Sequence, residues 1–362
     1  MKKIMTVVGA RPQFIKAGIT SKTLRKTFDE ILVHTGQHYD VNMSDVFFEE
    51  MNIPKPNYNL GVGSGSHASQ TANIMIELEK VIINENPDGL LIYGDTNSTV
   101  AAALTASKLN IPVFHVEGGV RTGFFDMPEE QNRIVSDHLS SLIFVATKED
   151  EINLKKENLS DICRYTGDVM YDALKYYTKI ALKKDWEFYC KELVSLFGEN
   201  INLDKQFILA TTHRPENTDK LENLIHILEA LNKSGKHVLF SVHPRIYEKI
   251  MKVHKKYKNI SFVEPLSYFE TLYFTKQAFH VVTDSGGLHK EAYLHGTPCT
   301  TILRNGWIQT LNGNWNRFVR PEEKAILASI HRDNIDYSVK RDQFGYGNSC
   351  ELITKQIKKF FS

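Results

Sequence analysis

The sequence is poor in cysteine, has almost no net charge and lacks any long apolar run. Its four cysteines lie far apart and form no Cys-x-x-Cys pair, which argues against a metal site or a disulfide framework. Lysine and arginine number 44 and aspartate and glutamate 43, so the net charge of +1 gives no preference for nucleic acid. No apolar run approaches the roughly 20 residues that span a bilayer. We therefore expect a cytoplasmic protein without a metal, a nucleic-acid partner or a membrane segment.

The amino terminus has two lysines before an apolar stretch, as a short secretory signal does. That stretch is interrupted at Gly9, Arg11 and Pro12. It therefore fits a first β-strand better than a signal peptide.

Apolar runs of strand length alternate with longer amphipathic stretches in both halves of the chain, which predicts βαβ units and parallel sheets. The expected strands are 4–8, 30–34, 89–93, 112–116 and 142–146 in the first half, and 207–211, 237–241, 260–263, 280–283 and 299–303 in the second. Helical spacing covers 70–85 and 99–109, a charged helical stretch covers 171–197, and an amphipathic one covers 350–361.

A break near 165–168 divides the two halves. Because 362 residues are too many for one ordinary core, we predict an α/β fold of two Rossmann-like, doubly wound domains facing a cleft. One large sheet is the alternative.

Three acids stand near the ends of predicted strands or the start of a helix. Asp95 follows 89–93, Glu117 follows 112–116, and Glu129 comes shortly after. Ligands of open parallel sheets bind at the carboxyl ends of the strands, and clustered carboxylates there have divergent pKa values that suit acid and base roles. The alternatives are that Asp95 caps the next helix and that Glu129 is only a first-turn acid after Pro128.

Two strand-to-helix turns are candidate anion sites. Arg11 and Lys16 follow the first strand at or near a helix N-terminus, although a plain turn with solvated charges is equally consistent. Ser285, Gly286 and Gly287 offer exposed amides and a hydroxyl to a diphosphate.

Residues near the turn at Ser285, Gly286 and Gly287 also suit nucleotide binding. Glu291, one turn into the following helix, is placed to bind a ribose diol. The competing interpretation of this turn is helix capping by Asp284 or Ser285. His213 and His243 each follow a strand of the second half beside an arginine, where they suit phosphate binding or proton transfer. Either one alone is equally consistent with a packed loop histidine, but two such histidines after neighbouring strands favour a polar site.

With these residues assembled, the chain resembles the UDP-N-acetylglucosamine 2-epimerase family of bacteria and archaea. The matching motifs are GARPQFIK at 9–16, GQH at 36–38, GDTNST at 94–99, HVEGGVRTG at 115–123, PEEQNR at 128–133, THRPEN at 212–217, HPR at 243–245 and TDSGGLHKEA at 283–292. They span nearly the whole chain in the family's order.

The resemblance implies a GT-B-like fold with domains 1–167 and 168–348 and a C-terminal helix, 349–362, returning to the first domain. It also implies inversion at C2 of a UDP-linked N-acetylhexosamine without a metal or nicotinamide, and a homodimer. In the family's mechanism UDP is eliminated across C1–C2 and added back after protonation from the opposite face.

The resemblance also implies residue roles. Asp95, Glu117 and Glu129 match the family's catalytic acids, and His213 matches its catalytic histidine. The positions that match its UDP contacts are Arg11, Lys16, Ser285, Gly286, Gly287, Glu291 and Arg304. Which acid serves which face is left open.

Two segments depart from the family pattern. After Arg304 the family has a short acidic loop, whereas the stretch 305–316 here contains no acid, a change that favours an anionic sugar. At 37–40 the chain reads Gln-His-Tyr-Asp, so activation by substrate is not carried over. The early segments are most similar to the branch that acts on UDP-linked 2,3-diacetamido-2,3-dideoxyglucuronic acid.

Three other functions remain open from the sequence. A hydrolysing 2-epimerase would release UDP, and a GT-B glycosyltransferase would share the two-domain fold and the UDP site. A binding protein that has lost catalysis through the altered loop is the third.

Overall fold

A computed structural model describes residues 1–37, 51, 53–304 and 306–362. The positions His38, Tyr39 and Asp40, where we noted a departure from the family pattern, lie outside the described residues, and so does Asn305. The described chain forms two compact units, 1–176 with 342–362 and 177–341. Among the described helices, none is long and apolar enough to cross a membrane.

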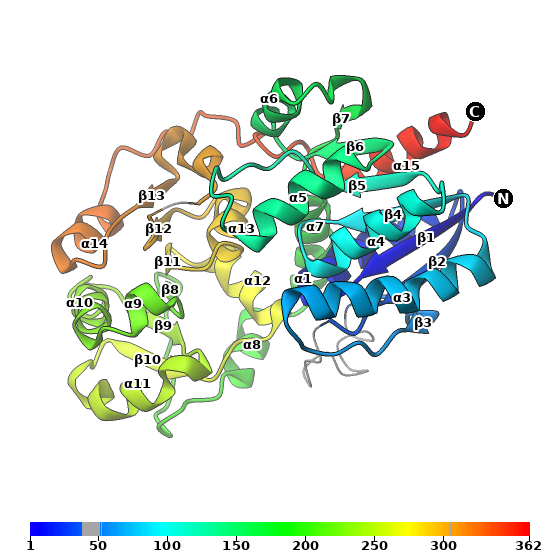
Figure 1. The fold of residues 1–362 in the computed structure, drawn as a ribbon. Helices are drawn as coiled ribbons and strands as arrows, with labels where there is room; N and C mark the ends of the chain where they lie inside the picture. Colours follow the sequence, from blue (N-terminus) through cyan, green and yellow to red (C-terminus); the bar gives the residue numbers. More distant parts are fainter. Residues whose placement is uncertain (38–50, 52, 305) are drawn as a thin grey trace. The chain divides into compact units, whose positions relative to one another are not determined.

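The first unit is built on a seven-stranded parallel sheet with the order β3-β2-β1-β4-β5-β6-β7 (Figure 1). Its strands are β1 (Lys3–Val8), β2 (Asp29–His34), β3 (Tyr58–Asn59), β4 (Gly89–Tyr93), β5 (Val113–Val116), β6 (Leu142–Val145) and β7 (Cys163–Tyr165). Its helices are α1 (Arg11–Leu24), α3 (His67–Glu85), α4 (Asn97–Lys108), α5 (Pro128–His138), α6 (Lys148–Lys156), η1 (Ser160–Ile162), α15 (Ser349–Phe360) and α7 (Val169–Ala181), which runs on into the second unit.

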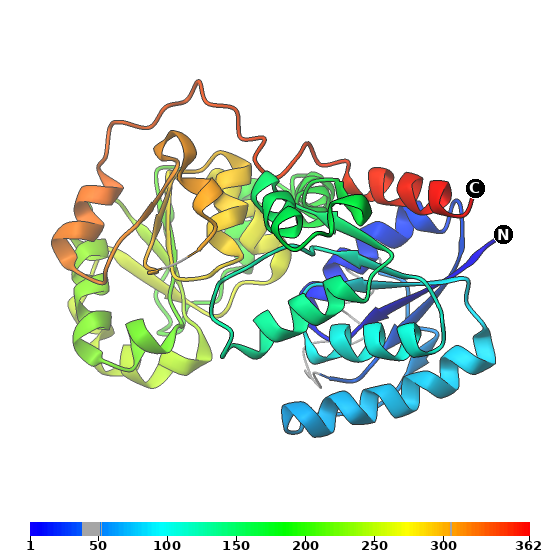
Figure 2. The ribbon, with the colours of Figure 1, turned by 45° about the horizontal axis from the view of Figure 1, so that its top comes forward.

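Helices cover both faces of this sheet, as a doubly wound fold requires. The helices α3, α4 and α5 lie side by side on one face (Figures 1 and 2), where Met5 and Val7 of β1 pack in one core with Leu78 and Ala102. Because side chains alternate along a strand, the neighbouring Thr6 points to the other face.

The C-terminal helix α15 packs against α1 on the first unit. The rings of Phe360 and Phe361 meet Phe114 of β5 at centroid distances of 5.2 and 5.8 Å. The carboxylate of Asp172 accepts hydrogen bonds from the amides of Ser349 and Cys350, each 3.0 Å long, and so satisfies the first turn of α15.

The second unit holds a six-stranded parallel sheet with the order β10-β9-β8-β11-β12-β13. Its strands are β8 (Ile208–Thr211), β9 (Val238–Ser241), β10 (Ile260–Val263), β11 (His280–Thr283), β12 (Cys299–Thr301) and β13 (Asn316–Phe318). Its helices are α8 (Trp186–Glu192), α9 (Pro215–Thr218), α10 (Leu221–Asn232), η2 (Pro244–Ile246), α11 (Tyr247–Val253), η3 (His254–Lys256), α12 (Tyr268–Gln277), α13 (Leu288–His295), η4 (Ile308–Asn314) and α14 (Glu323–Ile330).

The predicted α/β class with two doubly wound halves is confirmed, and the alternative of one large sheet is wrong. The single helical stretch expected over 171–197 is also wrong, because the chain forms α7 and α8 with a break between them. The carboxylate of Asp185 accepts a hydrogen bond from the Phe188 amide at 2.9 Å and starts α8 anew. Beyond α8 the chain is extended, and Ser195 forms an antiparallel bridge with Val263.

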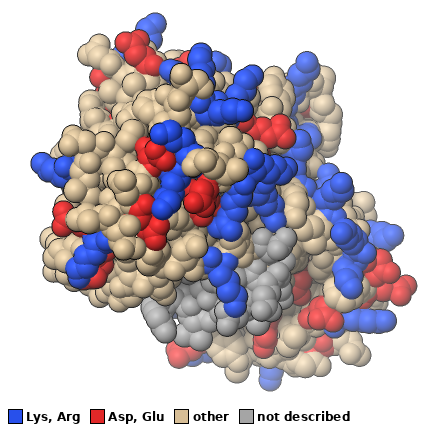
Figure 3. All heavy atoms as spheres, turned by 90° about the vertical axis from the view of Figure 1, so that its right-hand side faces the viewer, with Lys and Arg blue, Asp and Glu red and all other residues tan. Residues whose placement is uncertain are grey.

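Charged side chains of both signs are spread over the face that Figure 3 shows. The sequence has nearly equal numbers of acids and bases.

Candidate active site

In the first unit, the turns after β1 and β4 are adjacent, at the point where the strand order reverses. Gln13 links them, because its side-chain oxygen accepts from the amides of Gly9 and Ala10 at 2.8 and 3.1 Å and its nitrogen donates to the Tyr93 carbonyl at 2.6 Å. Position 9 requires glycine, since a Cβ there would collide with the side chain of Ser98. Doubly wound sheets bind ligands at such a switch point.

The two cations predicted beside the first turn lie in different environments. Arg11 is exposed at the first residue of α1. Lys16 lies beyond the first helical turn, is 8% exposed, and forms an ion pair with the carboxylate of Glu117. The positive charge of Lys16 is therefore directed at one of the candidate acids.

Asp95 is held by residues of α5 and does not cap a helix. Its carboxylate pairs with Arg133, and its carbonyl accepts from the side chain of Asn132 at 2.9 Å. Thr96 is the residue that caps α4, so the capping interpretation of Asp95 is wrong. About 30% of the Asp95 side chain is exposed, which leaves it accessible to a ligand.

Glu117 has an unusual backbone conformation. Its φ angle is +67°, in the left-handed region where a residue other than glycine costs on the order of 1 kcal/mol. The amides of Glu117 and Gly118 both donate to the carbonyl of Phe144, at 3.0 and 3.3 Å, and hold this turn. The Glu117 side chain lines a small pocket with Lys16 and Asp168.

The adjacent acids of α5 differ in environment. Glu129 is exposed in the first turn, so the first-turn position considered for it is observed. Glu130 is buried and accepts from the amides of Thr122 and Gly123 at 2.9 and 3.0 Å. Burial works to raise the pKa of Glu130, but these amides and Arg133 hold it below its ordinary value.

Glu129 and Arg133 are four residues apart on α5 and therefore lie on one face of the helix. Arg133 pairs with Asp95, so this helical face is the one that borders the turn after β4. The structure thus connects Asp95 to α5 through Arg133 and connects Glu117 to α1 through Lys16.

In the second unit, Asp284 organises the turns after β8 and β11. It is fully buried, and its carboxylate accepts from the Thr212 hydroxyl and from the amides of His213 and Arg214, at 3.0 and 2.9 Å for the two amides. The side chain of Asn217 adds a further hydrogen bond of 3.0 Å. Asp284 therefore binds the neighbouring loop, and Gly287 occupies the cap position of α13.

The two predicted histidines stack on each other. Their ring centroids are 5.1 Å apart, and Nδ1 of His213 lies 3.2 Å from the Asp284 carboxylate. Burial, followed by the nearby His213, lowers the pKa of His243 below its ordinary value. An imidazole oriented by a carboxylate is a suitable group for proton transfer.

The turn at Ser285, Gly286 and Gly287 keeps its backbone open. The Ser285 hydroxyl accepts from the Leu288 amide at 3.3 Å, so it contributes to capping α13. A Cβ at Gly286 would come no closer than 3.7 Å to Arg214, and one at Gly287 no closer than 4.0 Å to Ser285. The packing of the protein does not require glycine here, which favours close approach of a ligand to the backbone.

Two titratable groups of α13 have strongly shifted pKa values. Burial raises the pKa of Glu291 to about 7, although the neighbouring Lys290 works to lower it. Burial also lowers the pKa of His289 to about 4, so this imidazole is neutral near pH 7. Its Nδ1 lies 3.0 Å from the Ser285 carbonyl and its Nε2 accepts from the Trp307 amide at 3.4 Å. Such neutral or near-neutral buried groups gather at ligand sites.

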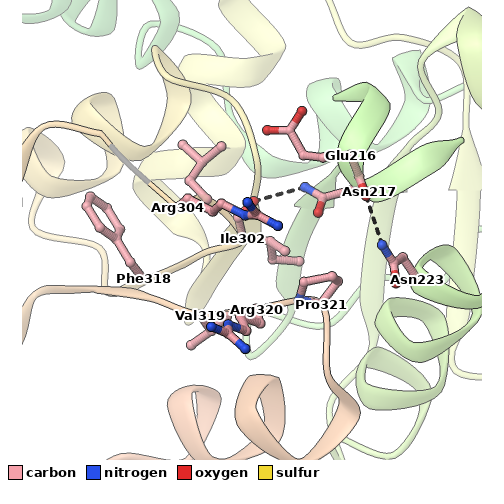
Figure 4. Close-up of a pocket in the computed structure, with 10 residues that line it drawn as sticks. Glu216, Asn217, Asn223, Ile302, Arg304, Phe318, Val319, Arg320 and Pro321 are labelled. Atoms are coloured by element: carbon pink, nitrogen blue, oxygen red, sulfur yellow. Dashed lines mark hydrogen bonds between the residues drawn. The ribbon is translucent and has the colours of Figure 1, made fainter. Parts of the chain in front are cut away.

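A pocket of about 590 Å³ opens at the carboxyl ends of β12 and β13 (Figure 4). Arg304 and Arg320 line it with positive charge, and Glu216 supplies a carboxylate. The side chain of Asn217 donates to the Ile302 carbonyl at 2.9 Å and fixes one wall. Arg304 is exposed, as a contact residue for a soluble ligand must be.

Sequence reasoning overlooked several polar residues that shape these turns. The side chains that it assigned no role are Gln13, His115, Arg133, Asp137, Asn217 and His289. Four of them lie inside the quoted motifs GARPQFIK, HVEGGVRTG, PEEQNR and THRPEN, and His289 lies inside TDSGGLHKEA. Asp137 lies outside every motif, and only its contact with His115 identifies it.

Comparison with known proteins places the chain in one family. Residues 22–358 match the family model described as UDP-N-acetylglucosamine 2-epimerase. A Methanococcus maripaludis protein named UDP-N-acetylglucosamine 2-epimerase homolog is 42% identical, covering 98% of this chain and 99% of its own length. The Pseudomonas aeruginosa UDP-2,3-diacetamido-2,3-dideoxy-D-glucuronate 2-epimerase is 38% identical, with 99% of each chain covered.

A solved structure supports the same assignment. The Methanocaldococcus jannaschii UDP-GlcNAc 2-epimerase, crystallised in complex with UDP-GlcNAc and UDP, superimposes with a TM-score of 0.80 at 35% identity and 99% coverage of both chains. The resemblance seen in the motifs is thereby confirmed. This chain belongs to the UDP-N-acetylglucosamine 2-epimerase family.

Proposed function

We propose that this protein inverts C2 of a UDP-linked N-acetylhexosamine by eliminating UDP across C1–C2 and adding it back. Given the family, the main structural support for this proposal is the arrangement of two acids. Asp95 and Glu117 follow the adjacent strands β4 and β5, and each carboxylate is paired with a cation while neither caps a helix. Elimination needs one group to remove the C2 proton and another to return a proton from the opposite face, and paired carboxylates suit both tasks.

The residue roles follow from the chemistry of each group. Asp95, Glu117 and Glu129 are the proposed acids and bases, and His213, held by Asp284, is a further proton-transfer group. Arg133 and Lys16 orient their partner carboxylates through these ion pairs.

UDP binding is assigned to the second unit, with cations of the first assisting. The open amides at Gly286 and Gly287 and the Ser285 hydroxyl suit the diphosphate, and Glu291 suits the ribose. The further UDP contacts in this proposal are Arg11, Lys16, His243 and Arg304. The domain ranges 1–167, 168–348 and 349–362, a homodimer and a cytoplasmic location belong to the same proposal.

The sugar is proposed to be of the UDP-GlcNAc type or its 2,3-diacetamido uronic acid derivative. The second possibility is favoured by the stretch 305–316, which has no acid beside Arg304 and would not repel a C6 carboxylate. It also agrees with the activity named for the Pseudomonas aeruginosa relative.

Incubation of the protein with each UDP-sugar separately, followed by proton and phosphorus NMR, tests the proposal. We expect a mixture of C2 epimers with only trace UDP. Stoichiometric UDP with free sugar would indicate a hydrolysing enzyme, and transfer to an added acceptor without change at C2 would indicate a glycosyltransferase. Tight binding in calorimetry without turnover of either sugar would indicate a binding protein.

A further inference from the structure

His115 and Asp137 form a buried pair to which the proposed chemistry gives no role. Nδ1 of His115 lies 2.7 Å from Oδ1 of Asp137, and Nε2 lies 2.7 Å from the carbonyl oxygen of Gly94. Both side chains have 0% exposure. A carbonyl oxygen only accepts hydrogen bonds, so Nε2 carries a hydrogen and donates it to Gly94.

Asp137 extends this contact to a second turn. Its Oδ2 accepts from the amide of Gly119 at 3.0 Å and lies 2.8 Å from the guanidinium of Arg121. Burial works to raise the pKa of Asp137, but His115, Arg121 and the Gly119 amide hold it below its ordinary value. Asp137 is therefore an ionised acceptor: its Oδ1 accepts from Nδ1 of His115, so both ring nitrogens of His115 donate, and its Oδ2 accepts from the backbone after β5.

The pair joins the three elements that carry the candidate acids. His115 lies in β5, its Nε2 holds the turn after β4, and Asp137 lies on α5. The candidate acids on or directly after these elements are Asp95, Glu117 and Glu129.

The turn after β5 has an unfavourable backbone conformation and is tightly packed, so neighbouring residues must hold it in place. Glu117 is held at a φ angle of +67°. At Gly118, a Cβ would collide with Ile143 and with Oδ1 of Asp137. The space beside this turn is therefore already filled by the buried carboxylate.

We propose that His115 and Asp137 are positioning residues that hold the turns carrying Asp95 and Glu117 in the geometry required for proton transfer at C2. The pair does not reach substrate and acts only through these two turns. The inference rests on the proposed function, because it assigns the pair a part in that reaction. Misplacing a reacting group by about 1 Å costs on the order of 100-fold in rate.

Two substitutions separate the two contacts of the imidazole. In His115→Asn the amide nitrogen takes the place of Nδ1, so the bond to Asp137 is kept and the bond to Gly94 is lost. In His115→Gln the amide nitrogen takes the place of Nε2, so the bond to Gly94 is kept. We expect kcat to fall about 100-fold in both variants with KM unchanged, because His115→Asn loses the contact with Gly94 and His115→Gln loses the contact with Asp137.

Ser136→Ala provides a matched control on the same helix. Ser136 is also fully buried, and within the described part of the chain its hydroxyl has no hydrogen-bond partner. We expect this variant to keep the wild-type kcat and KM. A loss equal to that of His115→Asn would show that any change at this depth disturbs the enzyme and would overturn the proposal.

Amide hydrogen exchange gives a readout that does not depend on turnover. In His115→Asn we expect faster exchange at 94–99, and in Asp137→Asn faster exchange at 117–123, with unchanged protection in β9 of the second unit. If the wild-type protein turns over no UDP-sugar, the proposed function fails. Hydrogen exchange would still show whether His115 and Asp137 hold the turns after β4 and β5 in place.

Three results would overturn the inference. The first is a wild-type kcat in His115→Gln, which would show that the contact between His115 and Asp137 is not needed. The second is wild-type kcat and wild-type exchange in His115→Asn. The third is failure of both His115 variants and of Asp137→Asn to fold, which would assign the pair to stability alone.

Discussion

Buried polar side chains set the position of the exposed ones in both units. Asp284 is fully buried and binds three consecutive residues of the loop after β8, including the amide of His213. A carboxyl group at 0% exposure is stable only when its oxygens have hydrogen-bond partners, and several donors surround this one. The position of His213 therefore follows from Asp284.

The open turn at Gly286 leads to a prediction on ligand binding. A methyl group at this position meets only Arg214, at 3.7 Å, so Gly286→Ala should fold with an unchanged melting temperature. The same methyl group would occupy the space beside the amides that we propose as the phosphate site. We expect the Kd for UDP, measured by calorimetry, to rise about tenfold or more.

Gly65→Ala is the control for that change, because a Cβ at Gly65 is also free of close contacts, the nearest atom being 4.0 Å away. It should bind UDP as the wild-type protein does. Wild-type UDP affinity in Gly286→Ala would contradict the assigned phosphate site.

Glu291 leads to a prediction on stability against pH. Burial raises its pKa from 4.5 to about 7, so the folded protein disfavours the ionised form. The contribution of the protonated group is complete below pH 4.5 and is lost as the pH rises through 7. Glu291→Gln should therefore increase the free energy of unfolding relative to wild type at pH 8, by on the order of 2 kcal/mol, and leave it unchanged near pH 4.5.

Urea unfolding of both proteins at the two pH values measures the difference in their free energies of unfolding. The contributions of all other titrating groups are the same in both proteins and therefore cancel in this difference. An equal difference between the proteins at both pH values would show that Glu291 is not held in its protonated form by burial.

Among the elements, α15 depends on a contact far away in sequence. Asp172 of α7 accepts hydrogen bonds from the first amides of α15, which the helix itself cannot satisfy. Asp172→Ala should lower the free energy of unfolding by about 1–2 kcal/mol, as loss of a helix cap does. Urea unfolding and hydrogen exchange in α15 measure the effect.

Glu351→Ala removes an exposed acid from the first turn of the same helix and serves as the control. We expect its stability to stay near that of the wild-type protein. Equal destabilisation by the two variants would contradict the capping role of Asp172.

The sequence predicts strands of four or five apolar residues better than the shortest strands or the breaks within helical stretches. The strands β4, β10 and β11 have the predicted bounds, because each is a short apolar run between polar turns. The strands β3 and β13 have only two or three residues, too few to show alternation, and were not predicted. The break before α8 was missed because helical spacing continues past Asp185.

The sequence predicts which site residues lie at strand ends, but it does not predict which side chains pair with them. Asp95 and Glu117 are apparent because each interrupts an apolar run. Arg133, by contrast, pairs with Asp95 across 38 positions, and Asp137 meets His115 across 22. Such pairs depend on how α5 packs beside the sheet, which spacing along the chain does not specify.

At the scale of the whole molecule, both units follow one construction. In each, the strand order reverses beside the first strand of the sheet, between β1 and β4 or between β8 and β11. The turns after β4 and β11 hold Asp95 and the glycine turn at Ser285–Gly287, while Glu117 follows the neighbouring strand β5 and Glu129 lies on α5. This common construction places candidate ligand-binding groups at the carboxyl ends of the strands in each unit.

The central claim is that Asp95 takes part in proton exchange at C2 of a UDP-sugar. The most direct test is incubation of wild type, Asp95→Asn and the exposed-acid control Asp126→Asn with UDP-sugar in deuterated water, with deuterium at C2 followed by NMR. We predict one deuterium at C2 with wild type and Asp126→Asn, and none with Asp95→Asn, which should still bind UDP. Epimerisation by the wild-type protein without deuterium at C2, or incorporation retained in Asp95→Asn, would contradict the account.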